Sequence, residues 1–319
     1  MLKLERVSKT YRVGMFGGGE LRAVRDVSFE VRPGEIVSLI GESGSGKTTI
    51  GRMILRLASV SSGAITYQGR DIRREPRRAY CREVQGIFQD PFSSYNPIFK
   101  ADHVFGMIRP TYFASLSASE WGERVESSLS AVGLAPGQVL HKYAHQLSGG
   151  QLQRMLIARA LVLDIHMLVA DEIISMLDAS TRIDVLNLLG DLKTRGLGIL
   201  FITHDLSLGY YCSERTLILS KGSIVEMGST AKVYRNPTHP YTRQLLASVP
   251  QLHEKWADLA HDLQLAADGI PCVYHAAYPD ARPQAGDGAA DPGRPALAEV
   301  EPDHWVGCFS PYVRGACGS

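Results

Sequence analysis

The pattern of apolar and polar positions changes near residue 35. Apolar and polar residues alternate at several places over residues 2 to 31, around a glycine turn at residues 17 to 19, and this period of two predicts short antiparallel strands. Glu35 to Ile40 is typical of a buried strand, and a glycine-rich turn leads from it to apolar residues at helical spacing between Ile50 and Leu57. This second pattern predicts a strand, a loop and a helix.

The middle of the chain lacks the strand rhythm. Residues 90 to 146 carry apolar side chains such as Trp121 and Leu129 among polar helix formers. They predict a helical subdomain, inserted at about residues 90 to 160.

The α/β alternation then resumes. A strand (Met167 to Ala170), an amphipathic helix (Asp178 to about Arg195) and a strand (Gly198 to Thr203) follow one another, and Lys221-Gly222 predicts a hairpin turn. The fold class is therefore α/β, with one domain over residues 1–250 that begins with an antiparallel β-subdomain.

Residues 251–319 form an irregular C-terminal tail in this interpretation. The 19 residues from Pro279 to Leu297 contain four Pro, three Gly and five Ala. Such a composition gives little apolar surface to bury, so we expect the tail to be partly disordered.

Composition argues against a protein that binds nucleic acid through bulk charge, spans a membrane or carries a signal sequence. The 319 residues include 34 Lys plus Arg against 33 Asp plus Glu, a balance that argues against binding of nucleic acid through bulk charge. No apolar run has the length of a membrane helix, and the charged N-terminus has no uninterrupted signal region. Five scattered cysteines without a Cys-x-x-Cys pair indicate a reducing compartment.

The turn after Ile40 fits a phosphate-binding loop. Its eight residues match Gly-x-x-x-x-Gly-Lys-Thr and read Gly41, Glu42, Ser43, Gly44, Ser45, Gly46, Lys47 and Thr48. A predicted strand precedes the motif and a predicted helix follows it, as the motif requires. Its amides and the helix N-terminus suit a phosphate, Lys47 reaches the terminal phosphates, and the Thr48 hydroxyl is a ligand for Mg²⁺. Thr49 is assigned to the same ATP site.

Two carboxylates follow the next buried strand. Asp171 ends an apolar run and would enter the magnesium shell, while Glu172 would polarise the attacking water. By itself the pair also fits a solvated strand end.

A third motif precedes the helix that begins near residue 150. Leu147 is followed by Ser148, Gly149, Gly150 and Gln151. A Ser hydroxyl and glycine amides at a helix N-terminus make an anion site, although the same residues also form an ordinary helix cap.

Together, the three motifs resemble the ATP-binding cassette of ABC transporters. The resemblance implies a P-loop ABC ATPase that binds ATP and Mg²⁺ and hydrolyses ATP. It also implies a head-to-tail dimer with a second ABC ATPase subunit, a copy or a paralogue, in which Ser148 to Gln151 act on the partner's ATP.

The resemblance assigns further roles. Tyr11 would stack on adenine, Gln89 would sense the γ-phosphate and bind the metal, Asp178 would lie in the dimer-interface loop, and His204 would hold the γ-phosphate with Glu172. The catalytic set is then Lys47, Gln89, Glu172 and His204. A core position for Tyr11 and structural roles for Gln89 and His204 remain the alternatives.

Two further segments, residues 88 to 97 and 236 to 246, are similar to the oligopeptide, dipeptide and nickel import ATPases. The resemblance implies import of oligopeptides or dipeptides, with nickel or another small solute as the alternative. It implies two transmembrane permease subunits, an extracytoplasmic substrate-binding protein, no nucleic acid partner, and a peripheral location on the cytoplasmic face of the membrane. A soluble ABC ATPase acting on nucleic acid or ribosomes and a non-hydrolysing regulatory cassette are alternatives from other classes.

The chain departs from these relatives in two places. Many carry four tail cysteines for an iron-sulfur cluster, whereas only Cys272 and Cys308 match here, so we expect no cluster. Relatives also read Pro-Thr after the Asp-Glu pair, where this chain has Ile173-Ile174. The lost fixed φ and hydroxyl predict slower hydrolysis.

Two surface segments complete the interpretation. Six arginines between Arg70 and Arg82, with Asp71, Glu75 and Glu83 interspersed, favour a solvated helix face over a nucleic-acid site. Apolar residues from Pro91 to Val104 lie where a permease would dock in the family, the alternative being ordinary core.

Overall fold

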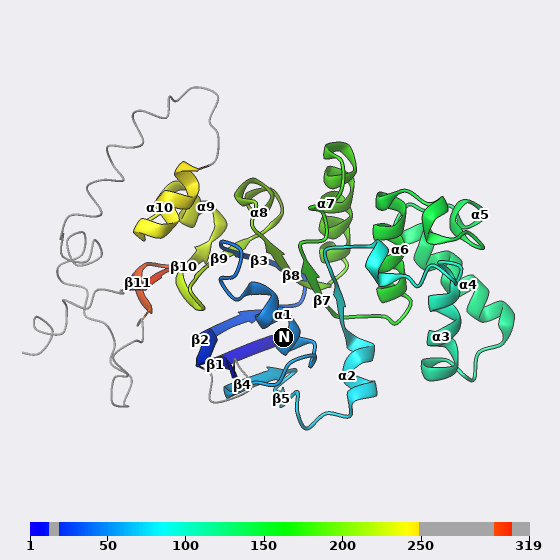
Figure 1. Ribbon diagram of the computed structural model, residues 1–319, viewed down its shortest axis with the longest axis horizontal. Helices are drawn as coiled ribbons and strands as arrows, with labels where there is room; N and C mark the ends of the chain where they lie inside the picture. Colours follow the sequence, from blue (N-terminus) through cyan, green and yellow to red (C-terminus); the bar gives the residue numbers. More distant parts are fainter. Residues whose placement is uncertain (13–18, 249–296, 308–319) are drawn as a thin grey trace, which may run out of the picture.

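The computed structural model describes residues 1–12, 19–248 and 297–307. It contains a four-stranded antiparallel sheet, an eight-stranded mixed sheet, and a group of helices beside the larger sheet (Figure 1). The strands are β1 (Leu2–Arg12), β2 (Glu20–Val31), β3 (Ile36–Ile40), β4 (Ser62–Tyr67), β5 (Arg70–Asp71), β6 (Val84–Ile87), β7 (Met167–Asp171), β8 (Gly198–Thr203), β9 (Arg215–Ser220), β10 (Ser223–Ser229), β11 (Leu297–Glu301) and β12 (His304–Gly307). The helices are α1 (Lys47–Ile54), α2 (Arg77–Glu83), α3 (His103–Tyr112), α4 (Ala118–Ala131), α5 (Pro136–Val139), α6 (Gly149–Leu161), α7 (Ala179–Thr194), α8 (Leu206–Cys212), α9 (Thr230–Arg235) and α10 (Pro240–Ala247), with 3₁₀ turns at Phe92–Ser94 and Ala144–Gln146.

The antiparallel sheet confirms the alternation at the N-terminus. Its strand order is β2-β1-β4-β5, and Leu4 lies opposite Phe29 on one side and Ile65 on the other. These three side chains are buried, which is why one face of each strand is apolar.

The larger sheet has the order β11-β12-β10-β9-β3-β8-β7-β6. Strands β9, β3, β8, β7 and β6 are parallel to one another, and β10 is antiparallel to β9. Every residue of β3, β7 and β8 is buried, which explains their apolar runs, since helices cover both faces of such sheets. Parallel strands carry all their carboxyl ends at one edge, where the phosphate loop follows β3 and the Asp171-Glu172 pair lies at the end of β7.

Sequence and structure agree on most of these elements. The helix expected after the phosphate loop is α1, but it ends at Ile54, so Leu57 lies beyond it and is exposed. The Lys221-Gly222 turn joins β9 to β10, with φ of 46° and 86° at its two residues, which is the conformation that a two-residue hairpin favours.

The helical segment consists of α3 to α6 and lies beside the β6 end of the larger sheet (Figure 1). Ser117 caps α4 with a reciprocal capping box to Glu120. Trp121 and Leu129 are buried and belong to a core that continues into Ile199 and Phe201 of the sheet. The helices therefore share one apolar core with the sheet.

The C-terminal residues contain a feature that the sequence did not predict. Residues 297–307 form the β11–β12 hairpin, and β12 pairs with β10, with Met227 opposite Trp305. The interpretation of the whole C-terminal segment as irregular omitted this hairpin, because its pairing partner lies about 80 residues earlier in the chain. Cys272 and Cys308 lie outside the described residues.

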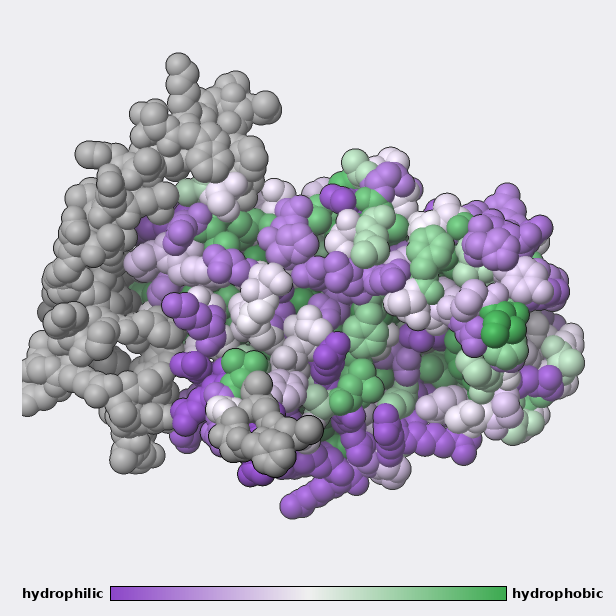
Figure 2. Space-filling view, in the orientation of Figure 1, coloured by the Kyte–Doolittle hydropathy of each residue, from purple (hydrophilic) through white to green (hydrophobic). Residues whose placement is uncertain are grey.

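The arginine cluster is not one helix face. Arg70 lies in β5, Arg73 and Arg74 lie in the following turn, and the other three arginines lie on α2. All six are exposed, and Figure 2 shows hydrophilic residues gathered along the lower edge of the molecule, where β5 and α2 lie in Figure 1. Arg73 pairs with Asp71 at 2.7 Å.

None of the helices within residues 1–12, 19–248 and 297–307 has the length and apolar composition needed to cross a membrane.

Candidate functional site

The candidate residues meet at the carboxyl edge of the parallel strands. Ile40, the last residue of β3, lies beside Thr203 of β8, and Ile202 of β8 lies beside Asp171 of β7. At the next strand Ile87 of β6 lies beside Ala170. Consequently the phosphate loop, His204, Glu172 and Gln89, which follow these strand ends, project from one edge of the sheet.

The phosphate loop is held closed by its own lysine. Lys47 is buried and its Nζ donates to the carbonyl oxygens of Gly41, at 2.7 Å, and Glu42, at 2.8 Å. Burial lowers the pKa of Lys47, while the charges of Glu172, Asp171 and Glu42 act in the opposite direction.

Two loop positions require glycine. A Cβ on Gly41 would lie 2.2 Å from the carbonyl oxygen of Leu219, and Gly46 has φ of 109° with Ala23 O only 2.4 Å from the position of a Cβ. Neither backbone oxygen can move cheaply, so the loop passes between β9 and β2 only without side chains at these positions.

Asp171 lies beside the start of α1. Its side chain is buried, and Oδ1 has no hydrogen-bond partner among the described residues. Burial raises the pKa of Asp171 and the negative charge of Glu172 adds to this, whereas a hydrogen bond with Thr48 and the charges of Lys47 and Arg52 lower it. A buried acceptor without a partner costs free energy, so this oxygen is suited to a cation.

Glu172 and His204 form a pair. Glu172 Oε1 lies 3.2 Å from His204 Nδ1, and the Glu172 amide donates to Ile202 O at 2.9 Å. Glu172 has φ of 51°, a left-handed conformation that non-glycine residues rarely adopt and that recurs at active sites. The Glu172 side chain is 19% exposed and that of His204 57%, so the pair lies at the surface, where a ligand can reach it.

For Gln89 and Tyr11 the structure shows the position in the fold but no contact with the other candidate residues described above. Gln89 is exposed, two residues beyond β6. Tyr11 is half-buried in β1 rather than in a core cluster, and Lys9 Nζ lies 4.9 Å from the centre of its ring. The core alternative for Tyr11 is therefore wrong in this structure.

The Ser148 to Gln151 motif caps α6. Gln151 N donates to Ser148 Oγ at 3.2 Å, and Ser148 N donates to Gln151 Oε1 at 2.9 Å. Gly150 packs against α7, because a Cβ there would lie 2.4 Å from Thr181 Cγ2. The helix-cap role is thus real, and it leaves Ser148 exposed at a helix N-terminus.

Asp178 caps the neighbouring helix α7. Its carboxylate accepts from Thr181 N at 3.0 Å, from Ser180 Oγ at 2.6 Å and from Thr181 Oγ1 at 2.8 Å. These hydrogen bonds lower the pKa of Asp178 strongly. Asp178 and Gly150 therefore both contact Thr181.

Ile173 and Ile174 are buried, with exposed fractions of 1% and 2%, and belong to the core shared with α6 and α7. The loop that carries Glu172 is thus anchored by apolar packing in place of a proline ring.

One site residue was missed by the sequence analysis. Tyr241, at the start of α10, accepts a hydrogen bond from Glu42 N of the phosphate loop at 3.1 Å. Its segment, residues 236 to 246, was noted only as a family resemblance, and the sequence carries no local signal for a contact 199 residues away.

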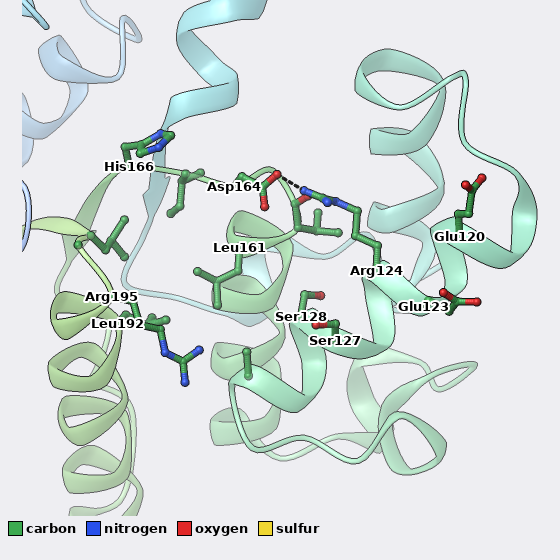
Figure 3. A pocket seen from close by; sticks show the side chains of 15 residues that line it. Glu120, Glu123, Arg124, Ser127, Ser128, Leu161, Asp164, His166, Leu192 and Arg195 are labelled. Atoms are coloured by element: carbon green, nitrogen blue, oxygen red, sulfur yellow. Dashed lines mark hydrogen bonds and ion pairs between the residues drawn. The ribbon is translucent and has the colours of Figure 1, made fainter.

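A separate cavity of about 720 Å³ lies among α4, α6 and α7 (Figure 3). His166 and Leu197 line it immediately before β7 and β8 begin, so it lies at the opposite edge of the sheet from Asp171. Figure 3 shows Arg124 reaching Asp164 across its wall. This cavity belongs to the packing of the helical segment and not to the candidate site.

Two family models match the chain. The ABC transporter model matches residues 24–175, and the model described as the oligopeptide/dipeptide transporter C-terminal region matches residues 225–284.

Similar proteins extend over nearly the whole chain. The putative oligopeptide transport ATP-binding protein YkfD of Bacillus subtilis is 38% identical, over 90% of this chain and 89% of its own. A putative peptide import ATP-binding protein of Brucella ovis is 39% identical, over 97% of both chains. The oligopeptide transport ATP-binding protein OppF of Streptococcus pyogenes is 38% identical, over 91% of both chains.

The chain is also similar to solved structures of ABC transporter cassettes. The dimeric structure of MJ0796, a bacterial ABC transporter cassette, has a TM-score of 0.64 and 28% identity, covering 72% of this chain and 99% of that one. A post-hydrolysis state of the same cassette, bound to ADP and Pi, also has a TM-score of 0.64, with 27% identity.

The fold and the sheet-edge site define an ATP-hydrolysing cassette of the P-loop class. The chain belongs to the ABC transporter family, in the branch of the oligopeptide and peptide ATP-binding proteins.

Proposed function

We propose that this chain is the ATP-binding and ATP-hydrolysing subunit of an importer of oligopeptides or dipeptides. The observation that carries the proposal is the Glu172–His204 pair, 3.2 Å apart, at the sheet edge where the phosphate loop begins. A carboxylate beside a phosphate site suits the activation of water, and the relatives that span the chain are named for peptide transport.

The residues present fit Mg²⁺. Asp171 Oδ1 is buried and has no hydrogen-bond partner within the described part of the chain, and the Thr48 hydroxyl is close enough to bond the same carboxylate, so hard oxygen donors converge as Mg²⁺ prefers. When bound, Mg²⁺ neutralises charge on the terminal phosphates. Gln89, at the end of the neighbouring strand, is assigned to the same metal.

The chain's own residues have distinct tasks. Residues 41 to 49 bind the phosphates, with Lys47 leaving its loop carbonyls for the terminal phosphates. Glu172 accepts a proton from the attacking water, His204 orients Glu172 and the γ-phosphate, and Tyr11 stacks on adenine.

Hydrolysis requires a second cassette in this proposal. Ser148 stands exposed at the α6 N-terminus, where its hydroxyl and the amides of Gly149 and Gly150 suit an anion brought by another molecule. The dimeric MJ0796 cassette supports such an arrangement. Asp178 lies in the adjoining loop and would contribute to the interface.

The permease would dock on the segment after β6. Phe92, Ile98 and Phe99 have exposed fractions of 50%, 76% and 46%, an unusual density of exposed apolar side chains for a short segment. Docking there would place the chain peripherally on the cytoplasmic face of the membrane, with an extracytoplasmic binding protein to select the solute.

The proposed division of the chain follows from these roles. Residues 1–250 form the ATP-binding domain, about residues 90–160 form the helical subdomain that faces the permease and the second cassette, and residues 251–319 form the branch-specific tail. Two matching cysteines are too few for an iron-sulfur cluster, so the tail would hold none.

The proposal is tested by purifying the complete chain with its permease and binding protein in lipid. We expect the ATPase rate to rise when the binding protein is loaded with a peptide, and not with nickel. If the ATPase rate rises with nickel and not with a peptide, nickel would be the transported solute and the peptide assignment would be wrong. Nucleotide hydrolysis that depends on RNA or ribosomes would overturn the transport assignment.

A further inference from the structure

Helix α10, in the C-terminal segment after β10, contacts the phosphate loop at Glu42. Glu42 N donates to Tyr241 Oη at 3.1 Å, and Glu42 O accepts from Lys47 Nζ at 2.8 Å. The same residue is thus held by Tyr241 on its amide side and by the loop lysine on its carbonyl side.

Gly41 is closely packed, but Glu42 is exposed on the side that faces α10. Glu42 and Ser43 line a cavity of about 760 Å³, with Tyr241 and Gln244 of α10 on its other wall. Because no packed side chain of a described residue limits movement on the cavity side, the hydrogen bond to Tyr241 adds to the Lys47 contact in fixing the position of Glu42.

Tyr241 is itself anchored through the start of α10. Its amide donates to His239 Nδ1 at 3.1 Å. The amides of Thr238 and His239 donate to the two carboxylate oxygens of Glu226, at 2.8 and 3.0 Å. Glu226 is fully buried in β10, where a carboxylate persists only with such donors.

The third donor to Glu226 comes from the C-terminal hairpin. His304 of β12 is fully buried, with Nε2 at 2.7 Å from Glu226 Oε1 and Nδ1 at 3.0 Å from Glu301 Oε1. A continuous chain of contacts therefore runs from the hairpin through Glu226 and the start of α10 to the phosphate loop.

We propose that Tyr241 is a positioning residue for the phosphate loop, and that the buried Glu226–His304 pair anchors it. The C-terminal hairpin, remote in sequence from the nucleotide motifs, thereby contributes to nucleotide affinity. This inference rests on the proposed role of residues 41 to 49 as the ATP phosphate site.

The test uses ADP binding to the full-length chain, measured by calorimetry with Mg²⁺ present, together with thermal unfolding of the nucleotide-free chain. Tyr241→Phe removes the hydroxyl and keeps the ring. We expect it to raise the Kd of ADP about threefold to tenfold, the range of one hydrogen bond, with little change in the apo Tm. In the assembled transporter, KM for ATP should rise more than kcat falls.

Two comparisons separate the possible failures. Tyr211→Phe is the matched control, because Tyr211 is a partly exposed tyrosine whose hydroxyl donates to Asn187 at 2.9 Å, and it should leave the Kd unchanged. Lys47→Ala should abolish ADP binding. If Lys47→Ala binds ADP normally, the proposed site is wrong. If it abolishes binding while Tyr241→Phe binds like the wild type, the site stands and the positioning role of Tyr241 is refuted.

The anchor is tested by a double-mutant cycle. Glu226→Gln weakens the contacts to α10, with His304→Gln as the substitute should that variant not fold. Either change should raise the Kd of ADP, and should add little in a Tyr241→Phe background, because all act through one contact. Additive effects, or no effect of either change on the Kd, would contradict the anchoring role.

Discussion

Glu172 illustrates how single residues determine the site. Its φ of 51° is unfavourable for a side chain with a Cβ, and the loop beyond it is kept in place by hydrogen bonds from Ser175 Oγ to Glu172 O and from Arg182 to the carbonyls of Ser175 and Leu177. The buried Ile173 and Ile174 add apolar packing. Hydrogen bonds and apolar packing of the following loop thus hold Glu172, whose backbone has this unfavourable φ, in place.

Reverting Ile173-Ile174 to Pro-Thr tests whether this loop limits turnover. We expect the ATPase rate of the assembled complex to rise, because the loop regains a fixed φ and a hydroxyl at the interface. The free energy of unfolding should fall by about 1–3 kcal/mol, because two buried apolar side chains shrink. Both are measured on the same preparation, and an unchanged rate would refute a kinetic role for this departure.

Gly150→Ala provides a steric test of the contact between α6 and α7. The new Cβ would lie 2.4 Å from Thr181 Cγ2, and Thr181 cannot rotate freely while its hydroxyl bonds Asp178. We expect the free energy of unfolding to drop by about 1–3 kcal/mol in a denaturant titration. Gly149→Ala is the matched control, because its Cβ would meet Leu177 at an ordinary 3.6 Å.

A second substitution at Thr181 distinguishes a clash with Thr181 from a general effect of Gly150→Ala on helix α6. Thr181→Ser removes the methyl group and keeps the hydroxyl, so it should restore stability to Gly150→Ala. Failure of the rescue would show that the clash is not the cause.

At the scale of elements, hairpin β11–β12 shows how a buried ion pair completes a sheet. His304 and Glu226 are fully buried. Burial alone lowers the pKa of His304, but hydrogen bonds and charges from Glu226 and Glu301 outweigh it and raise the pKa above its ordinary value. A buried charged pair is costly to break by removing one partner.

The hairpin should therefore lose stability at alkaline pH. A group whose pKa is raised by folding stabilises fully below its unfolded pKa, about 6.5 for His, and this contribution disappears as the pH rises through the folded pKa. Among the described residues, the other ionisable groups near His304 include Glu226, Glu301, Lys232, His239, Asp303 and Glu299. Burial lowers the pKa of His239 to about 4, so His239 does not titrate between pH 6.5 and 9.5.

The measurement is the difference in unfolding free energy between wild type and His304→Gln across pH 6.5 to 9.5. It should shrink as the pH rises. A His304 difference independent of pH would mean that the histidine is not charged in the fold.

Sequence predicts an element well when residues close together in the chain determine it, and poorly when the element depends on contacts between distant segments. The phosphate loop, Asp171 and the cap of α6 are set by neighbours in the chain, so the order and spacing of the motifs predicted their positions, although the Asp171–Glu172 pair and the cap each fit other roles when taken alone. Hairpin β11–β12 forms because β10 offers it an edge, and the Tyr241 contact spans 199 residues. Such features depend on the completed sheet, which no local pattern encodes.

For the whole molecule, the proposed hydrolysis requires a second cassette in addition to this chain. The carboxyl edge of the parallel strands carries the residues proposed for hydrolysis. The exposed Ser148 at the α6 N-terminus is proposed to act on the partner's ATP, and the exposed apolar residues after β6 are proposed to contact the permease. The cassette class follows from the fold, and the peptide-import role is the proposal built on it. The central claim is that Glu172 drives ATP hydrolysis between two cassettes.

Glu172→Gln tests the role of this carboxylate. The substitution keeps the shape of the side chain and removes its basicity. Phosphate release and retained ATP are measured for the full-length chain with its partner subunits, beside wild type. We expect phosphate release to fall by about two orders of magnitude or more while ATP remains bound and the cassettes stay associated. Undiminished phosphate release by Glu172→Gln would contradict the account.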